Sequence, residues 1–324
     1  MIDMGFNKDN YARIKQEYDG KYRRAEDDAK LRRAEVHAVC PEIKEIDHQL
    51  ASTGFSIFDA SLRGEMAEIE RAKKRNTQLL EQRASLLQKA GFASDYTEIR
   101  YECPACGDTG TVDYKMCKCM IKKLVEAGLE SSGMKDLIAT QTFDSFDLSY
   151  YKGDALNRMK TILSIVKDYA DTYKAGTSGN ILMMGNTGLG KTHLSSAMGG
   201  VIIEKGNDVY YTTATGMFSD FELNRFGNSA NAEVTGETEK YYTCDLLIID
   251  DLGTEVINQF TTSCLYNVIN SRLNRKKSTV INTNFNRDEM RKKYQDRITS
   301  RIFGEYMVLP FAGTDIREMK LMKK

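Results

Sequence analysis

The sequence has 324 residues, of which 41% are hydrophobic and 28% are charged, and it contains three prolines and no tryptophan. This length predicts two or three compact domains, and the composition is typical of a helix-rich folded protein and excludes a mainly disordered chain. Basic and acidic side chains number 46 each, so any nucleic-acid-binding surface has to be a local patch. No segment resembles a secretory signal or a membrane span, and we expect a cytoplasmic protein with no membrane partner.

Residues 1–95 are dense in Lys, Arg, Glu, Asp, Ala and Leu, which favours α-helices. Apolar residues between Leu62 and Leu87 recur at spacings of three, four and seven, as on one face of a helix. An earlier helix is expected from about residue 10 to 39, followed by Pro41 and by a break at residues 52–54. We therefore predict a helical hairpin or small bundle. It is either a solvated helical domain or a surface that docks another protein.

Four of the seven cysteines fall within seventeen residues, as the pairs Cys103 and Cys106, and Cys117 and Cys119. In a reducing compartment such clusters bind metal more often than they form disulfides. Four thiolates suit a structural Zn²⁺ ion and leave no open position for a catalytic water. We predict a zinc module over residues 96–130, with a redox pair or an iron–sulfur cluster as the alternatives.

After about residue 142, short apolar runs alternate with helix-length segments. The runs predict strands at residues 180–184, 208–213, 244–250 and 278–284. Strands that alternate with helices indicate an α/β domain, in which helices cover both faces of a parallel sheet. We place this domain at residues 153–324, after a linker at residues 131–152.

The segment GNTGLGKT directly follows the first of these predicted strands and fits the phosphate-loop pattern G-x-x-x-x-G-K-[ST]. Its backbone amides and the start of the next helix are expected to hold phosphate groups. Lys191 would reach the β and γ phosphates of ATP, and the Thr192 hydroxyl would take one place on Mg²⁺. The predicted nucleotide-binding loop consists of Gly185, Asn186, Thr187, Gly188, Leu189, Gly190, Lys191 and Thr192.

Two adjacent carboxylates follow the apolar run of another predicted strand. Asp250, at the carboxyl end of that strand, is expected to hold Mg²⁺ through water, and Asp251 to orient and deprotonate the attacking water. A strand inserted between the phosphate loop and this acidic pair is typical of P-loop proteins that hydrolyse ATP. Asn284, at the end of the next strand, is predicted to sense the γ-phosphate or position the water, with Asn282 as the alternative.

From Arg272 to Arg301 the chain has ten basic residues and three acidic ones. Such a patch is the best local candidate for contact with a nucleic-acid backbone or for an interface between copies of the chain. A solvated basic helix face is the alternative. Tyr210 and Tyr211 could stack on bases, although aromatic residues beside a strand more often belong to the core.

The order of these parts resembles the DnaC/DnaI-like replicative helicase loaders of the AAA+ superfamily, which are related to IstB-type transposition ATPases. The resemblance rests on the helical N-terminal region, the cysteine cluster, TFDSFDLSYY, GNTGLGKT, LLIIDDLGTE, STVINTN, DRITSRIFG and the terminal GTDIRE. It implies an α/β AAA+ P-loop ATPase core, preceded by an α-helical domain and a small zinc module. Because the sequence ends seven residues after Arg317, we expect no C-terminal lid domain.

The resemblance also implies a function. Loaders of this family bind the hexameric DnaB-type replicative helicase through their N-terminal region and load it onto single-stranded DNA, using an ATPase that assembles with its neighbours. By motif, Arg301 resembles the arginine finger that reaches a neighbour's ATP, with Arg297 as the alternative, and Arg317 resembles the sensor arginine of its own subunit. The alternatives are a transposition-helper ATPase on duplex DNA and a nucleotide-gated adaptor with little turnover.

Overall fold

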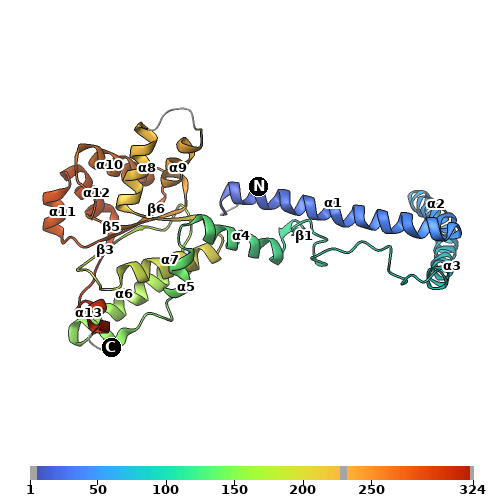
Figure 1. Cartoon of the computed structure of the whole chain (residues 1–324), viewed down its shortest axis with the longest axis horizontal. Helices are drawn as coiled ribbons and strands as arrows, with labels where there is room; N and C mark the ends of the chain where they lie inside the picture. Colours follow the sequence, from blue (N-terminus) through green and yellow to red (C-terminus); the bar gives the residue numbers. More distant parts are fainter. Residues whose placement is uncertain (1–5, 227–231, 322–324) are drawn as a thin grey trace. The chain divides into compact units, whose positions relative to one another are not determined.

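The computed structural model describes residues 6–226 and 232–321, and the chain divides into two compact units (Figure 1). The first unit, residues 14–120, contains the long N-terminal helices and the cysteine cluster. The second unit consists of residues up to 13 and from 121 onward, and it contains the large sheet. None of the described helices combines the length and apolarity that crossing a membrane requires.

The helical unit is built from α1 (Lys8–Val39), α2 (Pro41–Arg63) and α3 (Met66–Lys89). Pro41 lies in the first turn of α2, where its missing N–H costs no helical hydrogen bond. Gly64 ends that helix in the left-handed conformation, with φ at 72°, which a residue without Cβ adopts readily. The short connection brings α2 and α3 together as a helical hairpin (Figure 1).

Two details of the sequence prediction for this helical unit are wrong. The break at residues 52–54 does not exist, because α2 runs through them and the Thr53 hydroxyl donates to the carbonyl of Gln49 within the helix. The predicted apolar face is also buried only in part, since Leu79 and Leu87 are buried whereas Leu80 is 55% exposed. Spacing alone does not show which apolar residues a neighbouring helix covers.

Asp47 joins the three helices of this unit. Its carboxylate accepts hydrogen bonds from Nε of Arg83 on α3 at 2.6 Å and lies 2.7 Å from Nε2 of His37 on α1. A second guanidinium nitrogen of Arg83 donates to the Thr97 hydroxyl. Burial by itself would raise the pKa of Asp47, but the hydrogen bonds from Arg83 and His37 outweigh it and lower that pKa below its ordinary value.

The second unit contains a five-stranded sheet with the strand order β4-β5-β6-β3-β7, in which all neighbours are parallel. The four predicted strands are confirmed, and a fifth strand was missed. The strands are β3 (Asn180–Met184), β4 (Val209–Thr213), β5 (Leu246–Leu252), β6 (Ser278–Thr283) and β7 (Tyr306–Pro310). The sequence does not reveal β7 because it is an edge strand with three exposed residues, so it lacks a continuous buried run.

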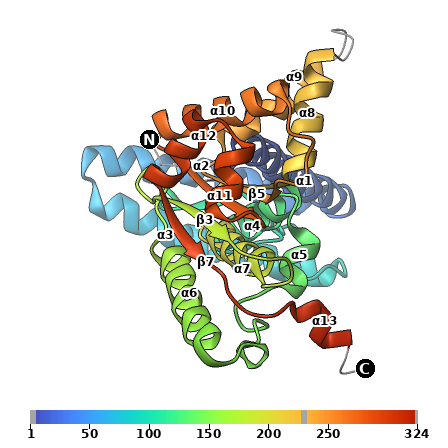
Figure 2. The same ribbon diagram turned by 90° about the vertical axis from the view of Figure 1, so that its left-hand side faces the viewer.

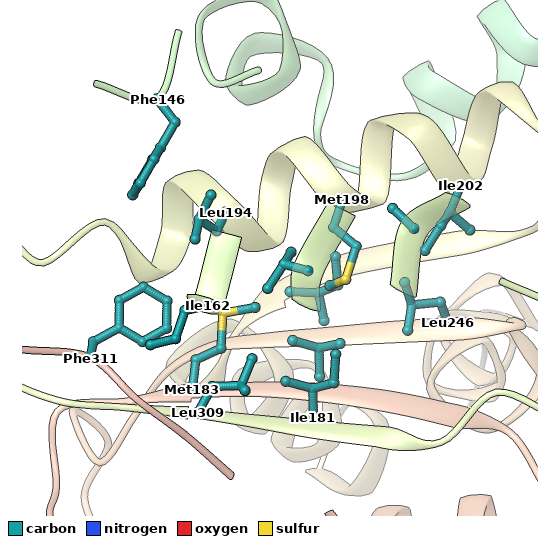
Figure 3. Close-up of a cluster of buried hydrophobic side chains, with 14 of the residues drawn as sticks. Phe146, Ile162, Ile181, Met183, Leu194, Met198, Ile202, Leu246, Leu309 and Phe311 are labelled. Carbon is teal, nitrogen blue, oxygen red and sulfur yellow. The ribbon is translucent and has the colours of Figure 1, made fainter. Parts of the chain in front are cut away.

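Helices cover both faces of this sheet, as predicted (Figure 2). α6 and α7 pack on one face, where Ile162 and Leu194 belong to a core cluster with strand residues such as Ile181 (Figure 3). Helices α8 to α12 pack on the other face. The bounds are α4 (Lys118–Ser131), α5 (Lys135–Thr140), α6 (Gly153–Thr172), α7 (Lys191–Glu204), α8 (Ala214–Phe226), α9 (Ala232–Thr243), α10 (Gln259–Asn274), α11 (Arg287–Lys293), α12 (Asp296–Glu305) and α13 (Ile316–Leu321), with a 3₁₀ turn at Leu148–Tyr150.

Candidate functional site

The predicted phosphate loop lies between β3 and the first residue of α7. Gly188 and Gly190 have φ values of 73° and 83°, and a Cβ on Gly188 would overlap the side chain of Asp315, whereas a Cβ on Gly190 would lie 2.7 Å from Phe146. Glycine is therefore required at both positions by backbone conformation and by space. The loop leads directly into α7, whose N-terminal end favours negative charge.

Lys191 is only 5% exposed and its ammonium is held inside the loop. Its Nζ donates to the carbonyl oxygens of Gly185 at 2.6 Å and Asn186 at 2.8 Å, and to Oδ1 of Asn284 at 2.8 Å. Burial lowers the pKa of Lys191 to about 8, although the carboxylates of Asp251 and Asp250 oppose this shift. The lysine is thus a buried cation whose partners are neutral oxygens, and phosphate oxygens would compete well for it.

Asp250 is the most highly coordinated carboxylate of the site. It is 3% exposed, and its oxygens accept hydrogen bonds from the Thr192 hydroxyl at 2.9 Å, the Tyr211 hydroxyl at 2.6 Å and the Asn282 amide at 2.7 Å. The last residue of the phosphate loop therefore contacts the acidic element directly. Neither Tyr211 nor the orientation of Asn282 was predicted to act here, because each depends on the pairing of strands that are distant in sequence.

The strand does not end at Asp250, contrary to prediction. β5 continues to Leu252, and its pairing with β6 shifts register between Ile249 and Leu252. At this irregularity Asp251 adopts φ of 53°, an uncommon conformation for a residue with a side chain. Asp251 lines the cleft described below, and burial, together with the charge of Asp250, raises its pKa.

These elements line one cleft of about 480 Å³. Lys191, Thr192, Asp251, Asn284 and Arg317 all contribute to its wall, so the structure brings together predicted residues from four separate segments. Asn282 is instead fully buried beside Asp250. Of the two asparagines, only Asn284 lines the cleft.

The segment of residues 142–151, which precedes α6, forms another wall of the cleft through Phe146 and Tyr150. His193, directly after Thr192, ties this segment to α7. Its Nε2 lies 2.8 Å from the carbonyl oxygen of Thr142 and 3.2 Å from the Ser145 hydroxyl, and its ring packs edge-on against Phe146. In the sequence, the position of His193 directly after the phosphate loop is the signal that could have indicated this contact.

The C-terminal segment crosses the phosphate loop. The backbone N–H of Ile316 donates to the carbonyl oxygen of Gly188 at 3.0 Å, and Asp315 accepts from the backbone N–H of Arg317 at 2.8 Å. These bonds place the Arg317 side chain at the cleft, in the same chain as the loop. Its role as a sensor arginine stays a prediction.

A protein-family model described as IstB-like ATP binding protein matches residues 125–307, more than half of the chain. The chain belongs to the IstB-like ATP-binding proteins. Its parallel sheet, flanked by helices, and its phosphate loop form the predicted AAA+ P-loop core.

The IstB-like protein is also similar to replication proteins. A replicative helicase loader DnaC of Buchnera aphidicola (subsp. Acyrthosiphon pisum) is 22% identical over 191 residues, which are 59% of this chain and 74% of that loader. A chromosomal replication initiator protein DnaA of Aliarcobacter butzleri is 31% identical over 176 residues, but these span only 34% of that initiator. A crystal structure of the DnaC helicase loader superposes with a TM-score of 0.47 at 21% identity, covering 55% of this chain and 99% of that one.

The predicted arginine finger lies outside the nucleotide cleft of its own IstB-like core. Arg301 on α12 donates to Oδ1 of Asn270 and to the carbonyl oxygen of Arg297, and both arginines lie over the ring of Tyr266. Neither belongs to the cleft lining. Neither arginine can therefore be assigned to the nucleotide of its own chain, and a contact with the nucleotide of another chain is the role to test.

Not all of the basic residues predicted to form a patch from Arg272 to Arg301 are exposed and unpaired. Arg272 is completely buried, where it donates to the Thr279 hydroxyl and to three backbone carbonyls, and is therefore a structural group. Lys277 pairs with Asp245 at 2.7 Å. The exposed basic surface is carried mainly by α11 and α12.

The four predicted zinc ligands converge. Their sulfur atoms all lie within 4.8 Å of one another, with Cys103 to Cys117 at 3.9 Å and Cys106 to Cys119 at 3.6 Å. A tetrahedral Zn²⁺ with Zn–S bonds of about 2.3 Å requires sulfurs about 3.8 Å apart. The side chain of Asp108 stabilises the first turn by accepting from the backbone N–H of Cys103 at 2.8 Å. The donor set and its spacing fit structural zinc.

Proposed function

We propose that this protein is an ATP-dependent loader, which binds a hexameric DnaB-type replicative helicase and delivers it onto single-stranded DNA. The observation that supports this most is the joining of Lys191, Thr192 and Asp250 into one nucleotide site on a core similar to DnaC loaders over most of their length. The helicase would bind the predicted N-terminal domain at residues 1–95. The zinc module at residues 96–130 and the linker at residues 131–152 would connect that domain to the ATPase domain at residues 153–324.

The site residues have distinct proposed roles in ATP hydrolysis. The loop amides and Lys191 would hold the phosphates, while Thr192 and Asp250 would hold Mg²⁺ with the hard oxygen donors that it prefers. When bound, Mg²⁺ would neutralise charge on the phosphate oxygens. Asp251, whose pKa is raised by burial, is suited to accept a proton from water, and Asn284 would orient that water.

Self-association would complete the site. A guanidinium from α12 of a neighbouring copy, Arg301 by our assignment, would stabilise the negative charge that develops on the transferred phosphoryl group. Such an arrangement makes hydrolysis depend on assembly. The exposed basic residues of α11 and α12 would contact the single strand or the neighbouring copy.

The family match favours one other candidate, a transposition-helper ATPase that binds duplex DNA, because the matching model is IstB-like. A nucleotide-gated adaptor with little turnover is the third candidate. The cysteine cluster and the helical hairpin that precede the shared core favour a protein partner and therefore the loader.

A loading assay separates these candidates. The full chain, a DnaB-type helicase from the same organism and circular single-stranded DNA are incubated with ATP, and DNA-bound helicase is isolated. We expect loading that requires ATP and is lost in Lys191→Ala. Strong stimulation of turnover by duplex DNA without helicase binding would favour the transposition helper. Nucleotide-dependent helicase binding without turnover or loading would favour the adaptor.

A further inference from the structure

We propose that Tyr211 is a positioning residue for the magnesium site, because its phenol restrains the Asp250 carboxylate that would hold Mg²⁺. This inference rests on the proposed ATP-hydrolysing site and adds a residue to it. The bond is short and direct, with 2.6 Å between the Tyr211 hydroxyl and Oδ2 of Asp250. An ionised carboxylate only accepts hydrogen bonds, so the phenol is the donor.

The lone pairs of Asp250 explain why the third donor matters. A carboxylate has about four lone-pair positions. Among the described residues, Thr192, Tyr211 and Asn282 donate to it. The amide nitrogen of Asn282 also donates to the Ser195 hydroxyl at 2.8 Å, which fixes the amide in turn. The Thr192 hydroxyl lies 3.2 Å from Oδ1 and 2.9 Å from Oδ2 of Asp250, so it bridges both oxygens. These three donors together restrict rotation of the carboxylate.

The backbone of Tyr211 is fixed from both sides. On one side, β4 pairs with β5 in a register that places Tyr211 opposite Ile248, two residues before Asp250. On the other side, the Tyr211 N–H donates to the carbonyl oxygen of Ser132 at 2.9 Å. The turn between α4 and α5 therefore covers the outer edge of β4. Because β4 is held on both sides, it positions the phenol firmly.

Tyr210 provides a matched control on the same strand. Successive side chains of a strand point to opposite faces, and Tyr211 packs with the cluster on the α7 face whereas Tyr210 packs with the cluster on the α8 face. The ring of Tyr210 lies 5.4 Å from that of Tyr241 and makes no contact with Asp250 that the structure describes. Removing either hydroxyl deletes one oxygen from the same strand, but only one of them orients the carboxylate.

The test is the linkage between Mg²⁺ and nucleotide, measured by titrating a fluorescent ATP analogue into the full chain. In EDTA, Tyr211→Phe should bind the analogue as the unmodified chain does. Mg²⁺ should increase the affinity for the analogue in both proteins. The Mg²⁺ concentration that gives half of this increase should be about tenfold higher in Tyr211→Phe, as expected for one lost hydrogen bond to a charged group. Tyr210→Phe should leave that concentration unchanged.

Two results would overturn the proposal: an unchanged Mg²⁺ midpoint in Tyr211→Phe, or an equal loss of affinity with and without the metal. A double-mutant cycle adds a second criterion, because Tyr211→Phe should have no further effect on the midpoint once Asp250→Ala has removed its partner. Additive effects would contradict the mechanism. If helicase loading fails while this linkage behaves as expected, the loader function is wrong and the positioning role stands.

Discussion

The ammonium of Lys191 and the side-chain oxygen of Asn284 are 2.8 Å apart, which joins the phosphate loop to the residue directly after β6. The same ammonium donates to two loop carbonyls. Phosphate binding would draw the lysine away from these neutral oxygens, because hydrogen bonds between charged groups are stronger. Asn284 would then be free to orient water or a phosphate oxygen.

This exchange predicts how Asn284→Ala behaves. We expect nucleotide affinity to change less than about threefold, since the lysine and the loop amides remain, while turnover falls about 10- to 100-fold from loss of an orienting group. Lys191→Ala should instead lose binding. Equilibrium binding and single-turnover hydrolysis measure the two effects, and a loss of affinity in Asn284→Ala as large as that in Lys191→Ala would contradict the assignment.

A shared active site predicts complementation between two inactive variants. Arg301→Ala should keep nucleotide affinity but hydrolyse at least about a hundredfold more slowly, because a trans-acting arginine contributes about 10³- to 10⁵-fold in other P-loop proteins. In a mixture of the two variants, Arg301→Ala supplies an intact phosphate loop and Lys191→Ala supplies an intact arginine, so both can meet at one interface. We expect the mixture to recover part of the turnover.

Arg297→Ala is the control for that mixture, since it removes a guanidinium that lies over the same Tyr266 ring. If the mixture with Arg297→Ala recovers turnover and Arg301→Ala retains full activity alone, the finger is Arg297. No recovery in either mixture, with assembly intact, would rule out a trans-acting arginine on α12.

The cysteine geometry predicts one zinc ion per chain. Cys106→Ser should lose that ion and destabilise the unit of residues 14–120, because a closed four-thiolate site contributes directly to folding free energy. Metal analysis and thermal unfolding measure both effects. Nucleotide affinity of the other unit should not change. Cys264→Ser, at an isolated cysteine, should keep the metal, and equal zinc content in both variants would refute the site.

The lowered pKa of Asp47 predicts acid sensitivity of the helical unit. A carboxylate whose folded pKa lies below its ordinary value of 3.8 stabilises the fold fully above that value and loses this contribution as the pH falls through the folded pKa. Asp47→Asn should cost about 2 kcal/mol of unfolding free energy at pH 7, because Arg83 and His37 lose a charged partner.

The loss in Asp47→Asn should shrink below pH 4, and urea unfolding at several pH values would show it. Asp59→Asn is the matched control, since its ion pair with Arg63 is largely exposed and worth less than about 0.5 kcal/mol. Equal losses in the two variants, or a loss in Asp47→Asn that does not depend on pH, would contradict this account of Asp47.

The nucleotide site was predictable where chemistry is local in sequence. The spacing of the loop glycines, Lys191 and Thr192, and the buried run before Asp250, carry enough information to place both elements at the same edge of a parallel sheet. The adjacent residues Asp250 and Asp251 also indicated an acidic element near the end of a strand. The irregular pairing that places Asp251 in the cleft lining could not be seen in the sequence.

The contacts that connect these elements could not be predicted. Tyr211, His193 and Arg272 each act through a partner that the fold brings from far along the chain. In sequence they are respectively an aromatic residue in a strand, a scattered histidine and one member of a basic run. Their roles follow from strand order and packing, which apolar periodicity alone does not determine.

The structure of the full chain with Mg²⁺ and a non-hydrolysable ATP analogue tests the central claim most directly. We predict that the triphosphate lies on the loop from Asn186 to Lys191, with the metal beside the Thr192 hydroxyl and within one water of Asp250. A nucleotide bound away from this loop, or a metal that Thr192 and Asp250 do not share, would contradict the account.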